Sequence, residues 1–181
     1  MLETREDLAK YFAELGFTSG VEVGVNRGYY SRILCEANPK LKLYGVDPWD
    51  LLGPGRNDLR IKRYAEAQDY LSGVNAELIK KFSVDAAKDF ENESLDFVYI
   101  DGNHEFDDVM RDIIEWTPKI KKGGIVSGHD YDSMPGCYVR DAVDVYARIH
   151  KYDVRVLPKP DGEWKTRAGL IAQGKTWWFL R

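Results

Sequence analysis

The spacing of apolar residues changes repeatedly along the chain between a helical repeat and the short apolar runs of buried strands. Apolar positions three and four residues apart predict helices over residues 5–15, 29–37, 59–71, 105–116 and 138–150. Strands are predicted at residues 20–25, 41–47, 77–83, 95–101, 123–130, 153–158 and 176–181. This alternation favours a parallel sheet with helices on both faces.

The last two predicted strands are joined by a polar segment without a clear helical pattern. Parallel neighbours need a crossover connection, so one member of this pair is expected to run antiparallel. The predicted fold class is therefore α/β, with a Rossmann-like seven-stranded, mostly parallel sheet, helices on both faces and an antiparallel last strand pair. The length of 181 residues suits one domain covering residues 1–181.

Composition and charge narrow the possible functions. A net charge of -4 argues against a nucleic-acid partner, which favours a basic face. No stretch is apolar enough to span a membrane, and the first residues read as a helix and not as a signal peptide. The two cysteines, Cys35 and Cys137, form no CxxC pair, so a reducing compartment, the cytoplasm, is the expected location.

Polar residues gather where the predicted strands end. Open parallel sheets bind ligands at the carboxyl ends of their strands. The preference of turns for Gly, Asp, Asn and Ser explains part of this pattern. It explains less well why acidic residues follow several successive strands. The segments concerned are Glu22 to Gly28, Asp47 to Trp49, Ser83 to Asp85, Asp101 to His104 and Gly128 to Tyr131.

The loop after the first strand has two glycines. Gly24 permits a sharp turn out of the strand, and Gly28 lets the next helix start close to a ligand. Asn26 stands where the dinucleotide fingerprint G-x-G-x-x-G has its middle glycine, so the loop suits a nucleoside better than a dinucleotide. Asp47, at the end of the next strand, is either an acceptor for a ribose diol or a turn residue before Pro48.

Five stretches of the chain carry a family resemblance: "VEVGVNRGYYS", "LYGVDPW", "FSVDAAKDF", "LDFVYIDGNHEFDDVMRDI" and "KKGGIVSGHDY". Together they resemble the motifs of class I S-adenosylmethionine-dependent methyltransferases, and most closely methyltransferase family 24, similar to macrocin-type O-methyltransferases. The resemblance runs from about Gly20 to Tyr131. It implies a seven-stranded sheet with an antiparallel last hairpin, and S-adenosylmethionine as the ligand of the opening loop.

The resemblance also implies which residues bind this cofactor. The cofactor has no phosphates, which fits a loop without the dinucleotide fingerprint. Glu22 is placed near the cationic methionine end, and Asp47 at the ribose. Trp49 either stacks on the base or belongs to the core. The cofactor-binding residues expected are Glu22, Gly24, Asn26, Gly28, Ser31, Asp47, Trp49, Ser83, Val84 and Asp101, with Asp85 as a further neighbour of the adenine.

The methyl acceptor is expected beside two carboxylates. Asp101 and Asp130 end strands that are expected to pair, and paired strands lie about 4.8 Å apart, so both can reach one ion. Macrocin-type relatives have two adjacent acids where this chain has His129-Asp130. The expected metal ligands are Asp101, His129 and Asp130, holding Mg²⁺ or another divalent metal. The alternative is a site without metal that uses a histidine base.

Histidine titrates near neutral pH, and two of the three histidines follow adjacent strand ends. A structural role is the ordinary alternative for each. The catalytic residues expected are Asp101, His104, His129 and Asp130.

The function predicted is O-methylation of a hydroxyl on a small molecule, such as a sugar or a glycosylated metabolite. Residues 50–64 and 159–175 are expected to frame the acceptor pocket, and a homo-oligomer would let a short core share pocket walls. The alternative functions are a nicotinamide-dependent oxidoreductase and a non-catalytic S-adenosylmethionine-binding module.

Overall fold

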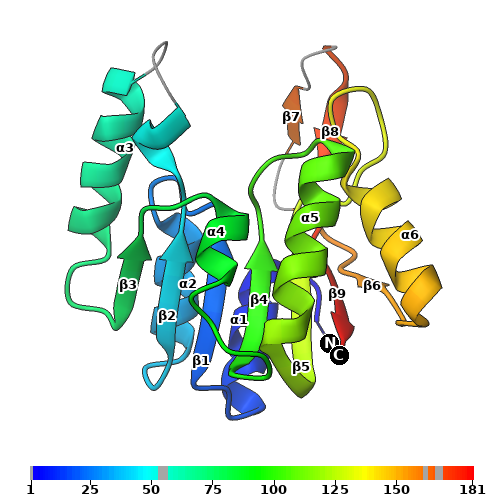
Figure 1. Ribbon diagram of the computed structural model, residues 1–181, viewed down its shortest axis with the longest axis horizontal. Helices are drawn as coiled ribbons and strands as arrows, with labels where there is room; N and C mark the ends of the chain where they lie inside the picture. Colours follow the sequence, from blue (N-terminus) through cyan, green and yellow to red (C-terminus); the bar gives the residue numbers. More distant parts are fainter. Residues whose placement is uncertain (1, 53–56, 161–162, 166–168) are drawn as a thin grey trace.

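A seven-stranded sheet forms the centre of the protein in the computed structural model, which describes residues 2–52, 57–160, 163–165 and 169–181 (Figure 1). The strand order is β3-β2-β1-β4-β5-β9-β6, and β7 and β8 form a separate two-stranded sheet. The strands are β1 (Ser19–Val23), β2 (Lys42–Val46), β3 (Ala76–Ile79), β4 (Leu95–Ile100), β5 (Ile120–Gly128), β6 (Arg155–Val156), β7 (Glu163–Lys165), β8 (Ile171–Gln173) and β9 (Trp177–Leu180).

Strand directions confirm the predicted fold class. Strands β3, β2, β1, β4 and β5 pair in parallel, and β9 runs antiparallel to both of its neighbours, β5 and β6. The register pairs Val23 with Val46 and with Ile100, and Ile100 with Gly128. Four parallel strands, β1, β2, β4 and β5, therefore end at the same level, and the residues that follow them share one edge of the sheet.

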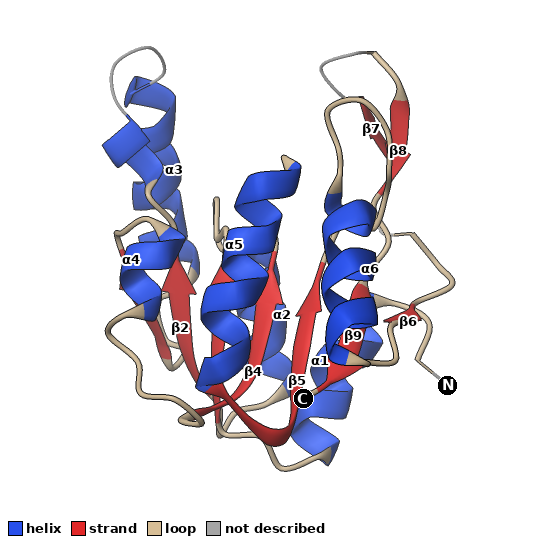
Figure 2. Cartoon of the chain, turned by 45° about the vertical axis from the view of Figure 1, so that its right-hand side comes forward, coloured by secondary structure: helices blue, strands red, loops and turns tan. Residues whose placement is uncertain are grey.

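Helices cover both faces of the sheet (Figure 2). Buried side chains of α1 and α2 pack on one face, and those of α4, α5 and α6 pack on the other. None of the helices in the described part of the chain combines the length and the apolar character needed to cross a membrane. The helices are α1 (Arg5–Glu14), α2 (Tyr29–Ala37), α3 (Asn57–Tyr70), α4 (Ser83–Ala87), α5 (Phe106–Trp116) and α6 (Val139–His150).

Strand β4 is the centre of the core, and all six of its residues are buried. On one face Phe97 stacks on Phe12 of α1, with ring centroids 4.2 Å apart. On the other face Val98 belongs to the cluster that contains Ile113 and Trp116 of α5. Burial on both faces explains why this segment is a continuous apolar run and not an alternating one.

The structure differs from the sequence prediction in six elements. Strand β3 ends at Ile79 instead of residue 83, and Ser83–Ala87 forms the unpredicted helix α4. Strand β5 begins at Ile120, before the two glycines expected to start it, and β6 has only two residues. The hairpin of β7 and β8 was not predicted. Apart from β5, these elements are short or lie at the edge of the sheet, where burial imposes little apolar pattern on the sequence. The first part of β5 was missed because residues 121–123 are exposed and carry no apolar run.

Candidate functional site

The candidate site lies at the carboxyl ends of β1, β2, β4 and β5. Helix α3 and the β7–β8 hairpin rise above this edge on opposite sides (Figure 1). The first part of α3 and the hairpin belong to the two segments predicted to frame an acceptor, residues 50–64 and 159–175. Within these segments, residues 53–56, 161–162 and 166–168 lie outside the described residues.

The exits of β1 and β4 are in backbone contact. The N–H of Asp101 donates to the carbonyl of Val23 at 2.7 Å. Gly24 has a φ of +93°, and a Cβ atom there would lie 2.0 Å from the carbonyl oxygen of Asp101. Position 24 therefore requires glycine for this close approach as well as for its backbone conformation.

Gly28 occupies the N-cap of α2 with a φ of +82°. A Cβ atom at this position would meet the side chain of Leu71 at 3.1 Å. The turn into α2 is thus shaped by packing against Leu71, the residue after α3, as well as by left-handed backbone, which favours glycine.

Asp47 organises the loop between β1 and α2. Its carboxylate accepts the backbone N–H of Asn26 at 2.9 Å and that of Trp49 at 2.7 Å. Burial raises the pKa of Asp47, and the two backbone hydrogen bonds oppose this shift. Each carboxylate oxygen has two lone pairs, so both can accept a further hydrogen bond from a diol.

Trp49, predicted to contact a base or to belong to the core, lies in the core. It is 2% exposed and packs with Val25 and with Ala67 of α3. Its indole N–H donates to the carbonyl of Asn26 at 2.9 Å. The tryptophan therefore supports the loop from behind instead of presenting a face for stacking.

Glu22 is a buried acid inside β1. It is 2% exposed, and Ser31 of α2 donates its hydroxyl to the Glu22 carboxylate. Burial raises the pKa of Glu22 to about 8, and the negative charges of Asp101 and Asp47 add to the shift. A cationic ligand beside Glu22 would favour its ionised form.

Ser83 begins α4 and is engaged with α5. Its hydroxyl accepts the indole N–H of Trp116 at 2.8 Å and bonds to the carboxyl of Asp112. Val84 beside it is half-buried, whereas Asp85 is exposed and pairs with a lysine.

Asp112 is a buried acid that the sequence analysis did not single out. It is 6% exposed, and burial raises its pKa to about 6. Its signal in the sequence is its position on the apolar stripe of α5, between Val109 and Ile113 and one turn before Trp116.

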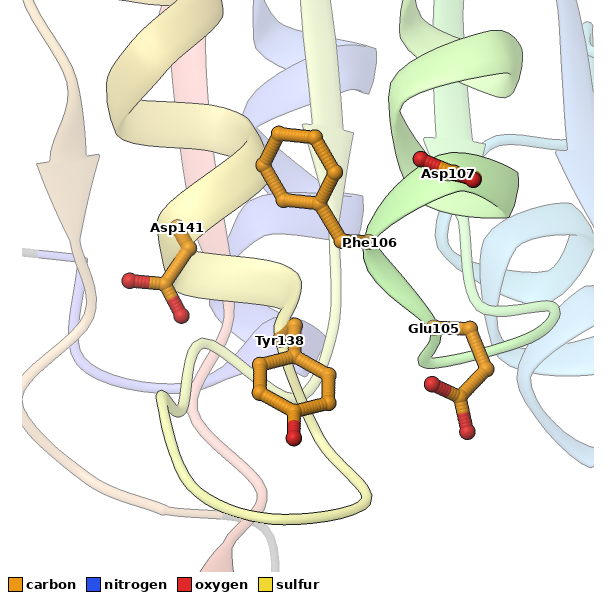
Figure 3. A pocket seen from close by; sticks show the side chains of 5 residues that line it. All are labelled: Glu105, Phe106, Asp107, Tyr138 and Asp141. Carbon is orange, nitrogen blue, oxygen red and sulfur yellow. The ribbon is translucent and has the colours of Figure 1, made fainter.

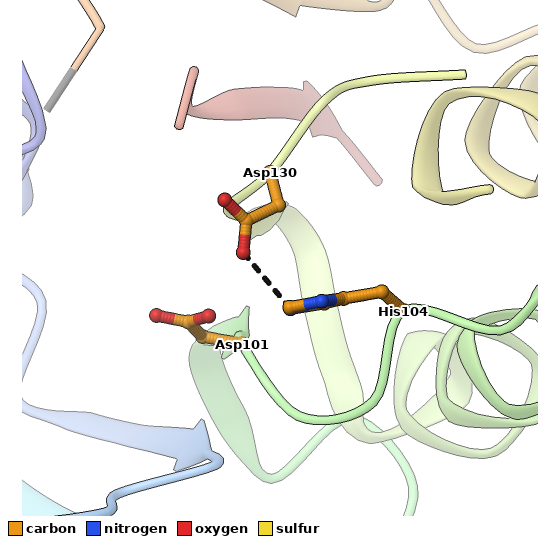
Figure 4. Close-up of side chains that lie close together, drawn as sticks. All are labelled: Asp101, His104 and Asp130. Carbon is orange, nitrogen blue, oxygen red and sulfur yellow. Dashed lines mark ion pairs between the residues drawn. The ribbon is translucent and has the colours of Figure 1, made fainter. Parts of the chain in front are cut away.

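Two acids and two histidines predicted as catalytic meet beyond β4 and β5. His104 Nε2 lies 2.9 Å from Asp130 Oδ2, and His129 Nδ1 lies 3.1 Å from Asp130 Oδ1. His129 Nδ1 is also 4.0 Å from Asp101 Oδ1. Figure 4 shows Asp101, His104 and Asp130 converging from the two strand ends.

The charges of this cluster are strongly coupled. Burial raises the pKa of Asp101 to about 6, assisted by Asp130 and opposed by His129. Burial also acts to raise the pKa of Asp130, but hydrogen bonds from both histidines outweigh it and hold this pKa well below its usual range. For His104, burial lowers the pKa, and the hydrogen bond to Asp130 outweighs it, so the net shift is upward.

Three residues of the cluster can each offer one ligand atom to a cation. These residues are Asp101, His104 and Asp130, and their three ligand atoms lie within 4.8 Å of one another. The sequence analysis expected His129 as the third ligand. The structure adds His104 to the two acids, because the loop after β4 brings its imidazole back to Asp130, while His129 Nδ1 also lies within 4.0 Å of an oxygen of each acid.

A solvent-open pocket of about 440 Å³ adjoins this cluster at the first turns of α5 and α6 (Figure 3). The backbone N–H of Tyr138 in its wall donates to the carbonyl of His104 at 2.8 Å. None of the lining residues was predicted as a site residue. They are Glu105, Phe106, Asp107, Tyr138 and Asp141.

One family model and two curated relatives match this chain. A family model described as a methyltransferase domain matches residues 21–131. An uncharacterized protein of Sinorhizobium fredii is 27% identical over 117 residues, which are 61% of this chain and 13% of that protein. An uncharacterized protein of Acanthamoeba polyphaga mimivirus is 30% identical over 131 residues, 70% of this chain and 57% of that protein. The chain thus spans less than two thirds of these curated relatives.

Solved structures share the fold at low sequence identity. An O-methyltransferase from Bacillus cereus in complex with SAH has a TM-score of 0.61 at 13% identity, covering 98% of this chain and 80% of that one. The O-methyltransferase TomG from Streptomyces achromogenes, in complex with SAM, has a TM-score of 0.60 at 15% identity, covering 97% and 79%. Precorrin 8W decarboxylase from Methanobacterium thermoautotrophicum has a TM-score of 0.66 at 13% identity, covering 98% and 89%.

The close approach at Gly24 predicts a large loss of stability in Gly24→Ala. The added methyl group would press on the backbone of Asp101, so we expect the free energy of unfolding to fall by at least about 3 kcal/mol. Gly73→Ala is the matched control, because Gly73 also has a positive φ but has nothing within 4 Å of its Cβ position. It should cost about 1–2 kcal/mol in urea denaturation. Equal losses would contradict the contact at Gly24.

The buried carboxyl of Glu22 predicts a pH-dependent stability. Its pKa is raised in the folded state from 4.5 to about 8. The contribution of the protonated carboxyl to the free energy of unfolding is therefore complete below pH 4.5 and is lost as the pH rises through 8. Glu22→Gln lacks this titration. Its free energy of unfolding relative to that of the wild type should therefore rise by about 2–4 kcal/mol from about pH 5 to about pH 8.5. Urea denaturation at both pH values measures this gain. The exposed Glu36→Gln should show no such gain, and a Glu22→Gln difference independent of pH would exclude the raised pKa.

Proposed function

Because the chain belongs to the methyltransferase-domain family of class I S-adenosylmethionine-dependent methyltransferases, we propose that it methylates a hydroxyl group of a small molecule. The observation that carries the proposal is the contact between the two halves of the site. The loop proposed to hold the methyl donor touches the backbone of Asp101, whose carboxylate belongs to the cluster with His104 and Asp130.

The proposed donor site follows the ends of β1 and β2. The sulfonium and ammonium groups of S-adenosylmethionine are cationic, and Glu22 supplies a buried carboxyl whose ionised form they would favour. The cofactor carboxylate is assigned to the start of α2, beyond Gly28, because the N-terminus of a helix is an anion-binding site. Asp47 accepts the ribose diol while its carboxylate keeps Asn26 in place. Ser83 and Val84 border the adenine at the start of α4.

The proposed acceptor site lies over β4 and β5. In the transfer step the acceptor oxygen attacks the methyl carbon in line, the carbon–sulfur bond breaks, and S-adenosylhomocysteine leaves. The hydroxyl proton must pass to a base, and His104 or His129 in its neutral form can take it. A divalent metal would instead make the hydroxyl more acidic. Alignment of the two reacting atoms supplies the other large part of the rate.

The pocket beside the cluster supports a small acceptor. Its rim combines Phe106 and Tyr138 with three acids, a mixture of ring faces and hydrogen-bond acceptors suited to a polyhydroxylated compound. A sugar or a glycosylated metabolite has this chemistry. The net charge of -4 makes nucleic acid a poorer candidate for the acceptor.

Cofactor binding is the first test, with Asp47→Ala as the informative variant. Wild-type protein should bind S-adenosylhomocysteine in calorimetry. Asp47→Ala should weaken binding by at least about tenfold, because a diol acceptor and the anchor of Asn26 are lost together. Asp50→Ala is the control: Asp50 lies on the same loop but pairs with Lys80 at 2.7 Å. Failure of the wild type to bind would overturn the proposal, and binding of NADH in its place would favour an oxidoreductase.

Asp130→Asn tests the acceptor side. Asp130 holds both histidines, so this change should lower methyl transfer from labelled S-adenosylmethionine by at least about a hundredfold. Affinity for S-adenosylhomocysteine should change less than about threefold, because Asp130 lies outside the donor loop. The assay uses a panel of hydroxylated sugars, with Asp153→Asn, at an exposed acid just before β6, as the control. Full activity in Asp130→Asn would remove this residue from the mechanism.

A further inference from the structure

Three hydrogen-bonded side chains join α5 to the start of α4. The indole N–H of Trp116 donates to Ser83 Oγ at 2.8 Å, and the hydroxyl of Ser83 is in turn hydrogen-bonded to the carboxyl of Asp112. Trp116 is fully buried and Asp112 is 6% exposed, whereas Ser83 is half-buried. Ser83 is therefore the member of this group that a ligand can reach most easily.

Asp112 lies between the two segments that border the proposed adenine position. Ser83 begins α4, and Gly102 follows Asp101 beyond the end of β4. Asp112 Oδ2 lies 3.7 Å from the position that a Cβ atom of Gly102 would take, and Gly102 itself is exposed. No step of the proposed methyl transfer uses Asp112. A buried carboxyl on the apolar stripe of α5 costs free energy that an apolar residue would not, which is a reason to expect a role for it.

The two neighbours of Ser83 determine how its hydroxyl can be used. A hydroxyl has one proton to donate and two lone pairs that accept, and an indole N–H only donates. Trp116 therefore occupies one lone pair of Ser83 Oγ. An ionised Asp112 only accepts, so the proton of Ser83 must point to it. Ser83 then has one lone pair left, and it can accept a hydrogen bond from a ligand but cannot donate one.

Protonation of Asp112 would reverse this direction. A neutral carboxyl can donate its own proton to the second lone pair of Ser83 Oγ, which frees the Ser83 proton for a ligand acceptor. Burial raises the pKa of Asp112 to about 6, and the Ser83 hydrogen bond opposes this shift. The ionised form, and with it the accepting form of Ser83, therefore prevails at neutral pH.

Charged groups lie on each of the elements that pack against Asp112. On α5 the carboxyl of Asp108, one turn earlier, raises the pKa of Asp112 further. On α4 Asp85 pairs with Lys88 at 2.7 Å, and beyond β4 the carboxyl of Asp101 belongs to the cluster with the histidines. Within the described residues no basic side chain forms an ion pair with Asp112, so a single hydroxyl group stabilises its ionised form.

We propose that Asp112 is a positioning residue that orients the hydroxyl of Ser83 as a hydrogen-bond acceptor, and that this orientation selects adenine over hypoxanthine. The inference rests on the proposed function, which places the adenine of the cofactor at the start of α4. The exocyclic amino group of adenine donates, so the free lone pair of Ser83 can accept it. Hypoxanthine has a carbonyl oxygen at that place, which would face a lone pair and leave both groups without a proton between them. Sites built on a hydrogen bond to one ligand group reject analogues that cannot form it.

Calorimetry on the full chain with S-adenosylhomocysteine and with S-inosylhomocysteine, which carries hypoxanthine in place of adenine, tests this role. The wild type should bind the adenine compound at least about tenfold more tightly. This ratio of affinities should fall at least about threefold in Ser83→Ala, which lacks the acceptor, and in Asp112→Leu, where the released hydroxyl can donate to the carbonyl. A purely structural role of Asp112 would weaken both compounds alike and leave the ratio unchanged. Glu115→Leu, at a half-buried acid one turn further along α5, is the control and should keep the wild-type ratio.

A measurement on the wild type guards against variants that fail to fold. The ratio should fall at least about threefold from about pH 7.5 to about pH 5, as Asp112 takes up a proton. The other acids and the histidines of the site face parts that the two compounds share, so their titration changes both affinities alike. A wild-type ratio near one, a ratio independent of pH, or an unchanged ratio in folded Asp112→Leu would each overturn the proposal. Failure of the wild type to bind S-adenosylhomocysteine would overturn the proposed function and this inference with it, whereas binding without discrimination rejects only the role of Asp112.

Discussion

Asp101 donates its backbone N–H to the carbonyl of Val23, and Gly24 then passes directly beside the carbonyl of Asp101. This contact fixes the exit of β1 against the exit of β4 at the centre of the sheet. The parallel register places the end of β2, before Asp47, level with the end of β1. It likewise places the end of β5, before Asp130, level with the end of β4. The donor and acceptor halves of the proposed site are therefore joined through backbone, so the distance between them depends little on side-chain rotamers.

Burial of acids at this edge has an electrostatic consequence. Burial raises the pKa of Glu22 to about 8 and that of Asp101 to about 6. The negative charges of Asp101 and Asp47 raise the pKa of Glu22 further, and the charge of Asp130 raises that of Asp101. Asp130 differs from these two buried acids, because hydrogen bonds from two histidines lower its pKa. The edge is thus short of positive charge. A cationic ligand would supply it, and any ligand that binds only the folded state also raises stability.

The sequence allowed the fold and the neighbours in the site to be predicted, because both follow from burial and strand order. Strand β4 is apolar throughout because both of its faces are covered, and it pairs with β5, so Asp101 and Asp130 had to end near each other. Strand β3 was predicted too long because exposed Lys80 and Lys81 follow it at the sheet edge, where no apolar pattern marks an end. The position of His104 depends on the path of a loop, which periodicity does not determine. Asp112 was detectable, since it interrupts an apolar helical stripe.

The two chemical roles considered for His104 exclude each other. The atom that faces Asp130 is Nε2, and a neutral imidazole has one lone pair, carried by a single nitrogen. If that lone pair binds a metal, it cannot accept the proton of an acceptor hydroxyl. If it accepts the proton, the resulting imidazolium pairs with Asp130 as the present geometry allows. His129 differs, because its Nδ1 faces Asp130 in both cases. Its contribution to the orientation of Asp130 is therefore the same whichever role His104 takes.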